Sequence, residues 1–387
     1  MTDRLYYTDS YLREFDARVV DRSADGRRVY LDRTAFYPAS GGQPFDQGVM
    51  GDVEVVEVID EGNSIAHVMS APLTAEACHC RLDWARRFDH MQQHSGQHLL
   101  SAVFVELFGF QTVSFHLGQE ASTIDLETAG VSAGQVSAVE TRANEVVFEN
   151  RPVAVSFADN SSDLDLRKEP EREGTLRIIA IEGIDRSACG GTHVRATGEI
   201  GPIVLRKLER IRSTVRVEFL CGMRTVHRAR RDFEGLSLVA QLFSSALEDA
   251  PELVRAQMES LRAADKLRKK LESDLAVFQG RALYESTAPG ADGLRRVVER
   301  SVEGSLESIR ALAQVFCNGS RAVFLGVVEN PPSLLLASSA DSSIDSGKLL
   351  KTAVTAHGGR GGGAPRLAQG SVPSRDALEA AIREILS

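Results

Sequence analysis

The sequence predicts an α+β protein that is built from several domains. Its 387 residues exceed the roughly 250 to 300 residues at which single hydrophobic cores stop growing, so we expect two or three domains. Hydrophobic residues make up 43% of the chain and charged residues 26%, which is typical of folded globular domains. Short alternating apolar runs occur early in the chain, and helical periodicity replaces them after about residue 92.

Residues 1–88 are expected to form a β-rich domain, with a barrel as one possible arrangement. Between Tyr6 and about Arg81, apolar runs such as Arg28–Leu31 and Val53–Ile59 alternate with turns rich in Gly, Asp and Pro. Alternation with period two is the pattern of half-buried strands. The first domain is therefore predicted to be a small sheet or barrel.

Residues 89–222 are expected to form an α+β domain. An apolar stripe at helical spacing predicts a buried helix over 92–108, whose first turns carry polar residues; the stripe comprises Leu99, Leu100, Val103, Phe104 and Leu107. Strands are predicted over 122–126, 176–181 and 215–220, with a second helix over 136–149. Helices and antiparallel strands mixed in this way favour the α+β class.

Residues 223–285 are predicted to form a helical linker or coiled-coil arm that is interrupted at Pro251. Beyond it, apolar residues recur every three or four positions, as Leu261, Ala264, Leu267, Leu271, Leu275 and Phe278. Such a seam packs on a neighbouring element or pairs two chains. A homodimer is therefore one expected arrangement.

Residues 286–387 are expected to form a final α/β domain. Strands are predicted over 322–328 and 333–337, followed by the glycine run 357–363. The run suits a flexible or tightly turned loop, and equally a phosphate contact through backbone N–H groups and the Arg360 cation. Residues 346–348 do not form a nucleotide-binding P-loop, since Ser342 stands where the motif requires glycine.

Charge, hydropathy and cysteine content limit the class of protein. The net charge of −9 offers no general attraction to nucleic acid, so any nucleic acid must bind to a local basic surface. No apolar run approaches the roughly 20 residues of a membrane helix and no signal peptide is evident, so we expect a cytoplasmic protein without membrane contact. Five thinly spread cysteines favour reduced thiols over a disulfide framework.

Two pairs of residues at i and i+4 predict a metal site. His94 and His98 would point from one face of a helix, and Cys189 and His193 stand four apart across two glycines. Three nitrogens and one sulfur suit tetrahedral zinc (Zn2+). The alternative to a metal site is that the two histidines form hydrogen bonds in the core and that the cysteine is present only because its side chain is small. A zinc protease is disfavoured, because Ser95 stands where that motif has its glutamate.

These pairs strongly resemble the HxxxH and CxxxH motifs of the editing domains of alanyl- and threonyl-tRNA synthetases. Residues 36–44 and 113–118 look like the glycine motif and the pocket strand of the alanyl branch, and 358–365 with 368–370 like its DHH-associated (DHHA1) domain. No aminoacylation domain precedes Tyr6, and there is no Asp-His-His signature. The chain is therefore similar to the long form of the AlaX family.

The resemblance implies an enzyme that removes a wrong amino acid from tRNA(Ala), chiefly serine and secondly glycine. It implies zinc held by His94, His98, Cys189 and His193, which activates water or only anchors the substrate. The residues expected to act on the substrate are His94, His98, Gln97 and His116, and those expected to bind it are Gly41, Gly42, Gln43, Thr192 and Arg360. The alternative is a non-catalytic, zinc-containing tRNA-binding protein; threonyl-type editing is disfavoured by the alanyl-like glycine motif and the C-terminal domain.

Overall fold

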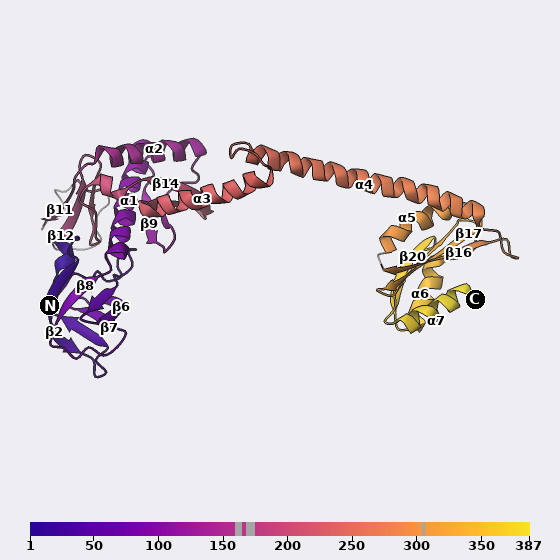
Figure 1. Ribbon diagram of the computed structural model, residues 1–387, viewed down its shortest axis with the longest axis horizontal. Coiled ribbons are helices and arrows are strands. Elements are labelled where there is room, and N and C mark those ends of the chain that lie inside the picture. Colours follow the sequence, from indigo (N-terminus) through magenta and orange to yellow (C-terminus); the bar gives the residue numbers. More distant parts are fainter. Residues whose placement is uncertain (159–164, 168–174, 304–305) are drawn as a thin grey trace. The chain divides into compact units, whose positions relative to one another are not determined.

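The computed structural model describes residues 1–158, 165–167, 175–303 and 306–387. The chain divides into two compact units, Met1–Gln241 and Leu242–Ser387 (Figure 1). Helices and strands occur together in both units, which confirms the predicted α+β class. The boundaries predicted near 88, 222 and 285 would subdivide these units and remain predictions. No helix in the described ranges is long and apolar enough to cross a membrane.

Six strands of the first unit close into a barrel, which confirms the β-rich, barrel-like domain predicted for the N-terminal part. Around the barrel the strands are β2 (Glu14–Arg22), β3 (Arg28–Leu31), β7 (Ile65–Met69), β6 (Val53–Asp60), β5 (Gly48–Met50) and β8 (Ala77–Leu82). In β8, Cys78, Cys80 and Leu82 are buried while the residues between them are exposed. This period of two fills the barrel with one face of each strand. A short ladder of β1 (Asp3–Arg4) with β4 (Arg33–Thr34) and the 3-10 helix η1 (Leu5–Tyr7) lies outside the barrel.

Helix α1 (Trp84–Phe108) begins earlier than the predicted start at residue 92. The Asp83 side chain caps it by accepting from the N–H of Arg86 at 3.1 Å. In the first turns Arg87 is fully buried, and its Nε donates to Asp46 of the barrel at 3.0 Å. The start of α1 thus buries polar groups that pair with residues outside the helix. Its apolar residues Trp84, Phe88 and Met91 nevertheless recur at helical spacing and pack on the core, a signal that the prediction overlooked.

Two antiparallel sheets surround α1 in the first unit. The four-stranded sheet has the order β14 (Ile203–Ile211), β15 (Thr214–Cys221), β10 (Ser122–Leu126) and β9 (Thr112–Leu117). The three-stranded sheet has the order β11 (Val153–Ala158), β12 (Leu176–Ile181) and β13 (Asp185–Ala188). The remaining elements are α2 (Ala133–Glu149), η2 (Thr197–Ile200) and α3 (Met223–Leu242). The strands predicted over 122–126 and 176–181 are confirmed with those bounds.

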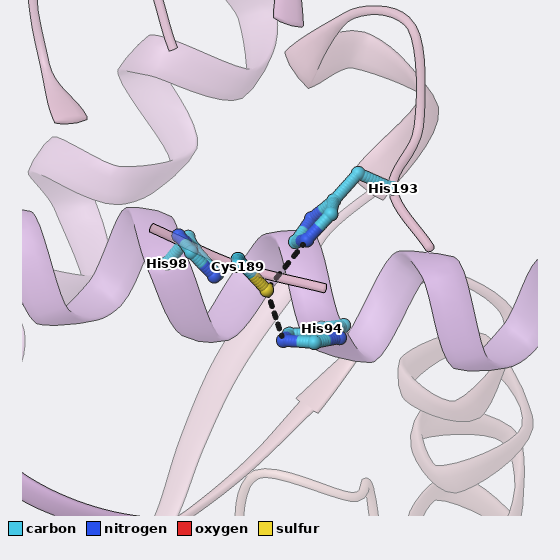
Figure 2. Close-up of side chains that lie close together, drawn as sticks. All are labelled: His94, His98, Cys189 and His193. Carbon is cyan, nitrogen blue, oxygen red and sulfur yellow. Dashed lines mark hydrogen bonds between the residues drawn. The ribbon is translucent and has the colours of Figure 1, made fainter. Parts of the chain in front are cut away.

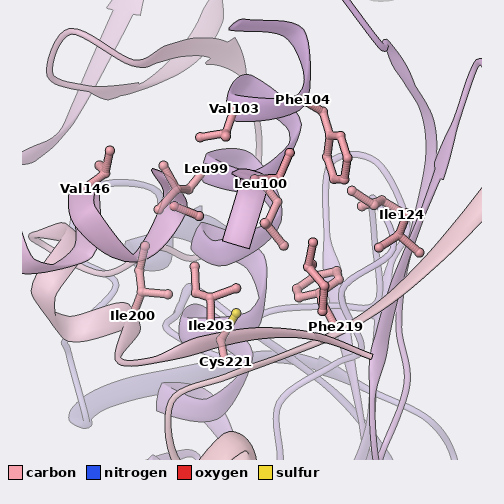
Figure 3. Close-up of a cluster of buried hydrophobic side chains, with 14 of the residues drawn as sticks. Leu99, Leu100, Val103, Phe104, Ile124, Val146, Ile200, Ile203, Phe219 and Cys221 are labelled. Carbon is pink, nitrogen blue, oxygen red and sulfur yellow. The ribbon is translucent and has the colours of Figure 1, made fainter. Parts of the chain in front are cut away.

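The main core of the first unit lies where the apolar half of α1 meets the four-stranded sheet and α2. Figure 3 shows Leu100 and Phe104 of α1 beside Ile124 and Phe219 of the sheet, with Val146 of α2 at the side. All five side chains are fully buried. This packing anchors the C-terminal half of α1, and the metal motif sits on the preceding turns of the same rigid helix.

The second unit is a five-stranded sheet with helices on both faces, which agrees with the predicted final domain. Its strand order is β16 (Arg295–Glu303), β17 (Ala322–Asn330), β18 (Ser333–Ser338), β20 (Leu367–Ser371) and β19 (Arg360–Ala364). The helices are α4 (Ala250–Ser286), α5 (Leu306–Phe316), α6 (Ser346–Ala356) and α7 (Arg375–Leu386). One buried cluster forms between the sheet and α6 and α7, and another between the sheet and α5.

The structure adjusts two expectations for the C-terminal half. The helical segment is interrupted just before Pro251: α3 ends at Leu242, and Pro251 lies in the first turn of α4, where its missing N–H leaves no hydrogen bond unmade. The glycine run is not wholly a loop, because Arg360–Ala364 forms the edge strand β19, paired antiparallel with β20. The predicted seam of α4 lies on its surface, with Leu261 and Phe278 largely exposed.

Candidate metal centre and active site

Four side chains from separate parts of the first unit converge on one point. His94 and His98 come from α1, and Cys189 and His193 come from the segment after β13; their ligand atoms all lie within 4.8 Å of one another (Figure 2). The Sγ of Cys189 lies 3.4 Å from Nε2 of His94 and 3.3 Å from Nε2 of His193. A tetrahedral zinc with bonds of about 2.3 Å to sulfur and about 2.0 Å to nitrogen separates such atoms by about 3.5 Å. The four side chains therefore fit one metal ion.

The barrel orients the first of these histidines through Gln43. Its Oε1 is 2.8 Å from Nδ1 of His94 and accepts the N–H of Thr192 at 3.1 Å, while its Nε2 donates to Oγ1 of Thr192 at 2.9 Å. Metal-bound histidines commonly donate their second ring N–H in this manner, which fixes the ring. Gln43 and Thr192 were predicted to contact substrate, but the structure places both behind His94, nearly free of solvent.

Asp185 orients the second histidine. Its Oδ2 lies 2.8 Å from Nδ1 of His98, and its Oδ1 accepts from Nε of Arg167 at 2.6 Å. Burial raises the pKa of the Asp185 carboxyl, but the hydrogen bond and charge of His98, together with Arg167, outweigh it and lower the pKa to about 2. The carboxylate is therefore charged, and it turns Nε2 of His98 toward the cluster.

The protonation states of Cys189 and His193 suit metal binding. Burial raises the pKa of the Cys189 thiol, yet the neighbouring His94 and His193 hold it well below its ordinary value, which favours the thiolate that binds metals. Burial lowers the pKa of His193 to about 3, so its ring is neutral. The Nδ1 of His193 lies 3.2 Å from Oγ of Ser95, which leaves Nε2 toward the cluster.

The loop that carries Cys189 is held in place by close packing and by one arginine. A Cβ at Gly191 would lie 2.2 Å from Cε1 of His94, so only glycine allows this approach. The Nη1 of Arg177 donates to the carbonyl of Cys189 at 2.7 Å and to that of Gly191 at 2.8 Å. Reasoning from the sequence missed Arg177 and Asp185, since neither belongs to a recognised motif.

A cavity of about 840 Å³ opens over the cluster and is lined by His94, His98 and Cys189. Of the other residues predicted to contact substrate, Gly41 and Gln97 also line it. The Nε2 of Gln97 donates to Oγ of Ser101 at 2.9 Å, and the same oxygen accepts from Oγ1 of the cavity-lining Thr112 at 2.7 Å. Among the described residues, the Oε1 of Gln97 makes no hydrogen bond. It is available as an acceptor at the cavity wall.

Three further residues that were predicted to act at the site are not among the described residues that line this cavity. His116 is exposed on β9 and is not among the described residues that line the cavity. Gly42 supports the wall from behind, since its carbonyl accepts the N–H of Leu117 at 3.1 Å. Arg360 belongs to β19 of the second unit.

A barrel joined to an α+β domain, with an HxxxH and a CxxxH pair meeting at a cavity, defines the class of proteins that carry the synthetase editing fold. Residues 176–217 match the family described as "Threonyl and Alanyl tRNA synthetase second additional domain", and residues 303–387 match the DHHA1 domain. Both matches fall where the sequence resemblance placed them.

The similar proteins agree on one family. The alanyl-tRNA editing protein AlaX-L of Pyrococcus horikoshii is 31% identical over 97% of this chain and 96% of its own length. The alanyl-tRNA editing protein Aarsd1 of Mus musculus is 32% identical over 82% of each chain. The alanine–tRNA ligase of Pyrococcus furiosus is 32% identical over 99% of this chain, which covers 43% of the ligase. The chain belongs to the alanyl-tRNA editing protein family.

Proposed function

We propose that this protein hydrolyses the ester bond of tRNA(Ala) that carries the wrong amino acid, chiefly serine and secondly glycine. The observation that carries the proposal is the cluster of three imidazoles and one thiolate in the wall of the cavity, in a chain of this family. The names of its relatives, editing proteins and a ligase for alanine, support tRNA(Ala) as the substrate.

Hydrolysis of this ester requires mainly that the protein position the reacting groups. An aminoacyl ester is already activated, so the site must orient water and stabilise the developing oxyanion. A zinc ion held by His94, His98, Cys189 and His193 would supply a Lewis acid at the ester carbonyl or lower the pKa of a bound water. The chain contributes rigidity: Gln43, Asp185 and Ser95 each fix the second nitrogen of one ligand ring.

The number of protein donors bears on the role of the metal. Four protein ligands are typical of a closed zinc site, whereas catalytic sites keep one position open. All four donor atoms lie close together here, and no histidine is set apart from the others. The donor count therefore favours a metal that orders the cavity wall and anchors the substrate over one that activates water.

Selectivity for serine over alanine would come from polar groups in the cavity wall. An aminoacylation site for alanine rejects serine by only about 1 to 3 kcal/mol, because the two differ by one hydroxyl. A second site that hydrogen-bonds the hydroxyl discriminates much better. We assign this contact to the free Oε1 of Gln97, whose amide is oriented by Ser101.

Deacylation of seryl-, glycyl- and alanyl-tRNA(Ala), with and without a chelator, tests the proposal. We expect fast hydrolysis of the seryl form, slow hydrolysis of the alanyl form, and loss of both zinc and activity in His98→Ala. The matched control is His79→Ala, which removes an exposed barrel histidine that pairs with Asp16. A protein that retains zinc but deacylates none of the three would instead support the non-catalytic tRNA-binding alternative.

A further inference from the structure

Three of the described residues that line the cavity are arginines, and they differ in how their charge is balanced. Arg4 pairs with Asp60 at 2.7 Å, and Arg167 pairs with Asp185 at 2.6 Å. Arg177 is only 7% exposed, yet no carboxylate of the described residues lies within ion-pair distance of it. Burying a cation without a paired anion is costly. The position of Arg177 therefore needs a reason beyond packing.

The terminal nitrogen Nη2 of Arg177 is not used within the protein. Its Nε donates to the carbonyl of Tyr7 at 2.9 Å, and its Nη1 donates to the carbonyls of Cys189 and Gly191 at 2.7 and 2.8 Å. Nη2 is buried and has no hydrogen-bond partner, and no other described residue of the cavity lining has such an atom. Buried donors are nearly always paired in folded proteins, so an unpaired one indicates a missing acceptor.

The role of Arg177 in holding the loop explains Nε and Nη1 but not the free Nη2. The thiolate of Cys189 is near enough to stabilise the arginine charge, but its own charge is neutralised when it binds a metal ion. Because Nη1 and Nη2 are attached to one carbon, Nη2 lies beside the loop that carries two of the four metal donors. The unpaired N–H groups are therefore close to the place where the ester of a bound substrate would react.

Hydrolysis of an ester creates a negative charge that such a donor would stabilise. The oxygen of water bonds to the carbonyl carbon, and the π electrons of the carbonyl move onto its oxygen. When the tetrahedral intermediate collapses, the bond to the ribose oxygen breaks and that oxygen takes a proton from the attacking water, which yields the free amino acid and a hydroxyl. Donors that are fixed before the reaction stabilise the oxyanion best. A metal with four protein donors offers no open position for it.

We propose that Arg177 is a catalytic residue whose Nη2 donates hydrogen bonds to the oxyanion of the tetrahedral intermediate. The inference rests on the proposed function, because that function supplies the ester. Nη2 is closed to water in the free protein, and catalytic hydrogen bonds commonly form only in the complex with substrate. The ring of Tyr7 also lines the cavity, with its centroid 5.7 Å from Cζ of Arg177. A shift of this half-buried ring would open Nη2 to the cavity.

The test compares the binding of two non-hydrolysable analogues of seryl-adenosine to the full-length, zinc-loaded protein. In one analogue an amide replaces the ester and resembles the substrate, and in the other a tetrahedral, anionic phosphonate resembles the oxyanion. Arg177→Gln retains one N–H donor group for the carbonyl of Cys189 but removes the cation and Nη2. Loss of one oxyanion donor costs about a hundredfold to a thousandfold, so we expect that loss in phosphonate affinity and in kcat for seryl-tRNA(Ala). Affinity for the amide and zinc content should not change.

Two further variants distinguish catalysis from support of the loop. Arg177→Lys retains a cation and should recover part of the phosphonate affinity. Arg224→Gln is the matched control, because Arg224 is a partly buried arginine of the same unit that pairs with Asp89 and does not line the cavity. It should bind both analogues like the wild type. Equal losses for both analogues, unchanged phosphonate affinity in Arg177→Gln, or loss of zinc from both Arg177 variants would overturn the proposal and assign Arg177 to the loop alone.

The outcomes also separate this proposal from the proposed function. A wild type that hydrolyses seryl-tRNA(Ala) but binds the phosphonate no more tightly than the amide contradicts only the role of Arg177. A wild type that binds the phosphonate through Arg177 but hydrolyses no aminoacyl-tRNA contradicts only the hydrolytic function. A wild type that binds neither analogue and hydrolyses nothing overturns both.

Discussion

Replacing Asp185 by asparagine should weaken metal binding although no ligand is removed. The carboxylate accepts from His98 on one oxygen and from Arg167 on the other, at 2.8 and 2.6 Å. An asparagine has only one acceptor oxygen, so in either orientation its NH₂ group must face a donor. If it faces Arg167, the support of the side chain is lost; if it faces His98, the ring must protonate Nε2, which then cannot bind metal.

The size of the effect follows from the hydrogen bonds that the carboxylate makes. Removing the partner of a metal-bound histidine typically costs tenfold to a hundredfold in metal affinity, which is about 1.4 to 2.7 kcal/mol. Asp185 is fully buried and also accepts from Oγ of Ser187 at 3.0 Å, so water cannot readily replace the missing acceptor. We therefore expect an effect near the upper end of that range.

Competition of the purified protein with a chromogenic chelator measures the zinc affinity, and circular dichroism checks the fold. Asp125→Asn is the matched control, because Asp125 also pairs with an arginine, Arg216, in a sheet of the same unit but does not contact the cluster. Zinc affinity in Asp185→Asn within threefold of the wild type, with the fold intact, would refute the reasoning.

Three further predictions concern selectivity, pH and domain roles. Gln97→Leu should lower kcat/KM for seryl-tRNA(Ala) about tenfold to a hundredfold and leave alanyl-tRNA(Ala) nearly unchanged; equal losses on both would contradict the assigned contact. Burial lowers the pKa of His67 to about 4, below its unfolded value of about 6.5, so stability is complete above pH 6.5 and falls as the pH decreases toward 4. Urea unfolding at pH 7 and pH 5 should show about 2 kcal/mol of this loss, and His67→Gln should not show it. A chain ending at Gln241 keeps the whole first unit, including the ion pair between Arg224 and Asp89. It should retain zinc and its turnover at saturating tRNA, but it should bind tRNA more weakly. Loss of turnover in a folded, zinc-bound truncation would contradict the assignment of catalysis to the first unit and tRNA affinity to the second.

The pairing of His94 with His98 could be predicted because it needs only local geometry, whereas its meeting with Cys189 and His193 is a tertiary contact that the donor set and the family resemblance indicated. Residues at i and i+4 on a helix share a face, so a helix over this segment necessarily directs the side chains of His94 and His98 to the same side. The residues that hydrogen-bond the second nitrogen of each histidine ring are harder to predict from local geometry. Gln43, for example, belongs to the N-terminal barrel domain and contacts His94 only in the folded chain. One available signal was overlooked: strand alternation puts Asp185 on the same face as Ser187, two residues before Cys189.

Elsewhere the sequence pattern was ambiguous or silent for identifiable reasons. The start of α1 buries Arg87 against Asp46, and the burial of a polar residue through a distant partner cannot be predicted from hydrophobic periodicity. Consecutive glycines are typical of loops, yet Gly361 permits the close approach of α6 and Gly363 that of the neighbouring strand β20. In both places a contact between distant segments decides the local structure.

The hydrogen bond from His94 to Gln43 means that the metal centre does not belong to a single module. All four donors lie between residues 94 and 193, but the side chain that fixes the first of them is supplied by the barrel. A gene that begins after the barrel would encode all four metal ligands, but the ring of His94 would lack the hydrogen bond that fixes it. Exchanging the barrel for an unrelated domain would carry the same defect, so the barrel and the helix that bears His94 form one functional unit.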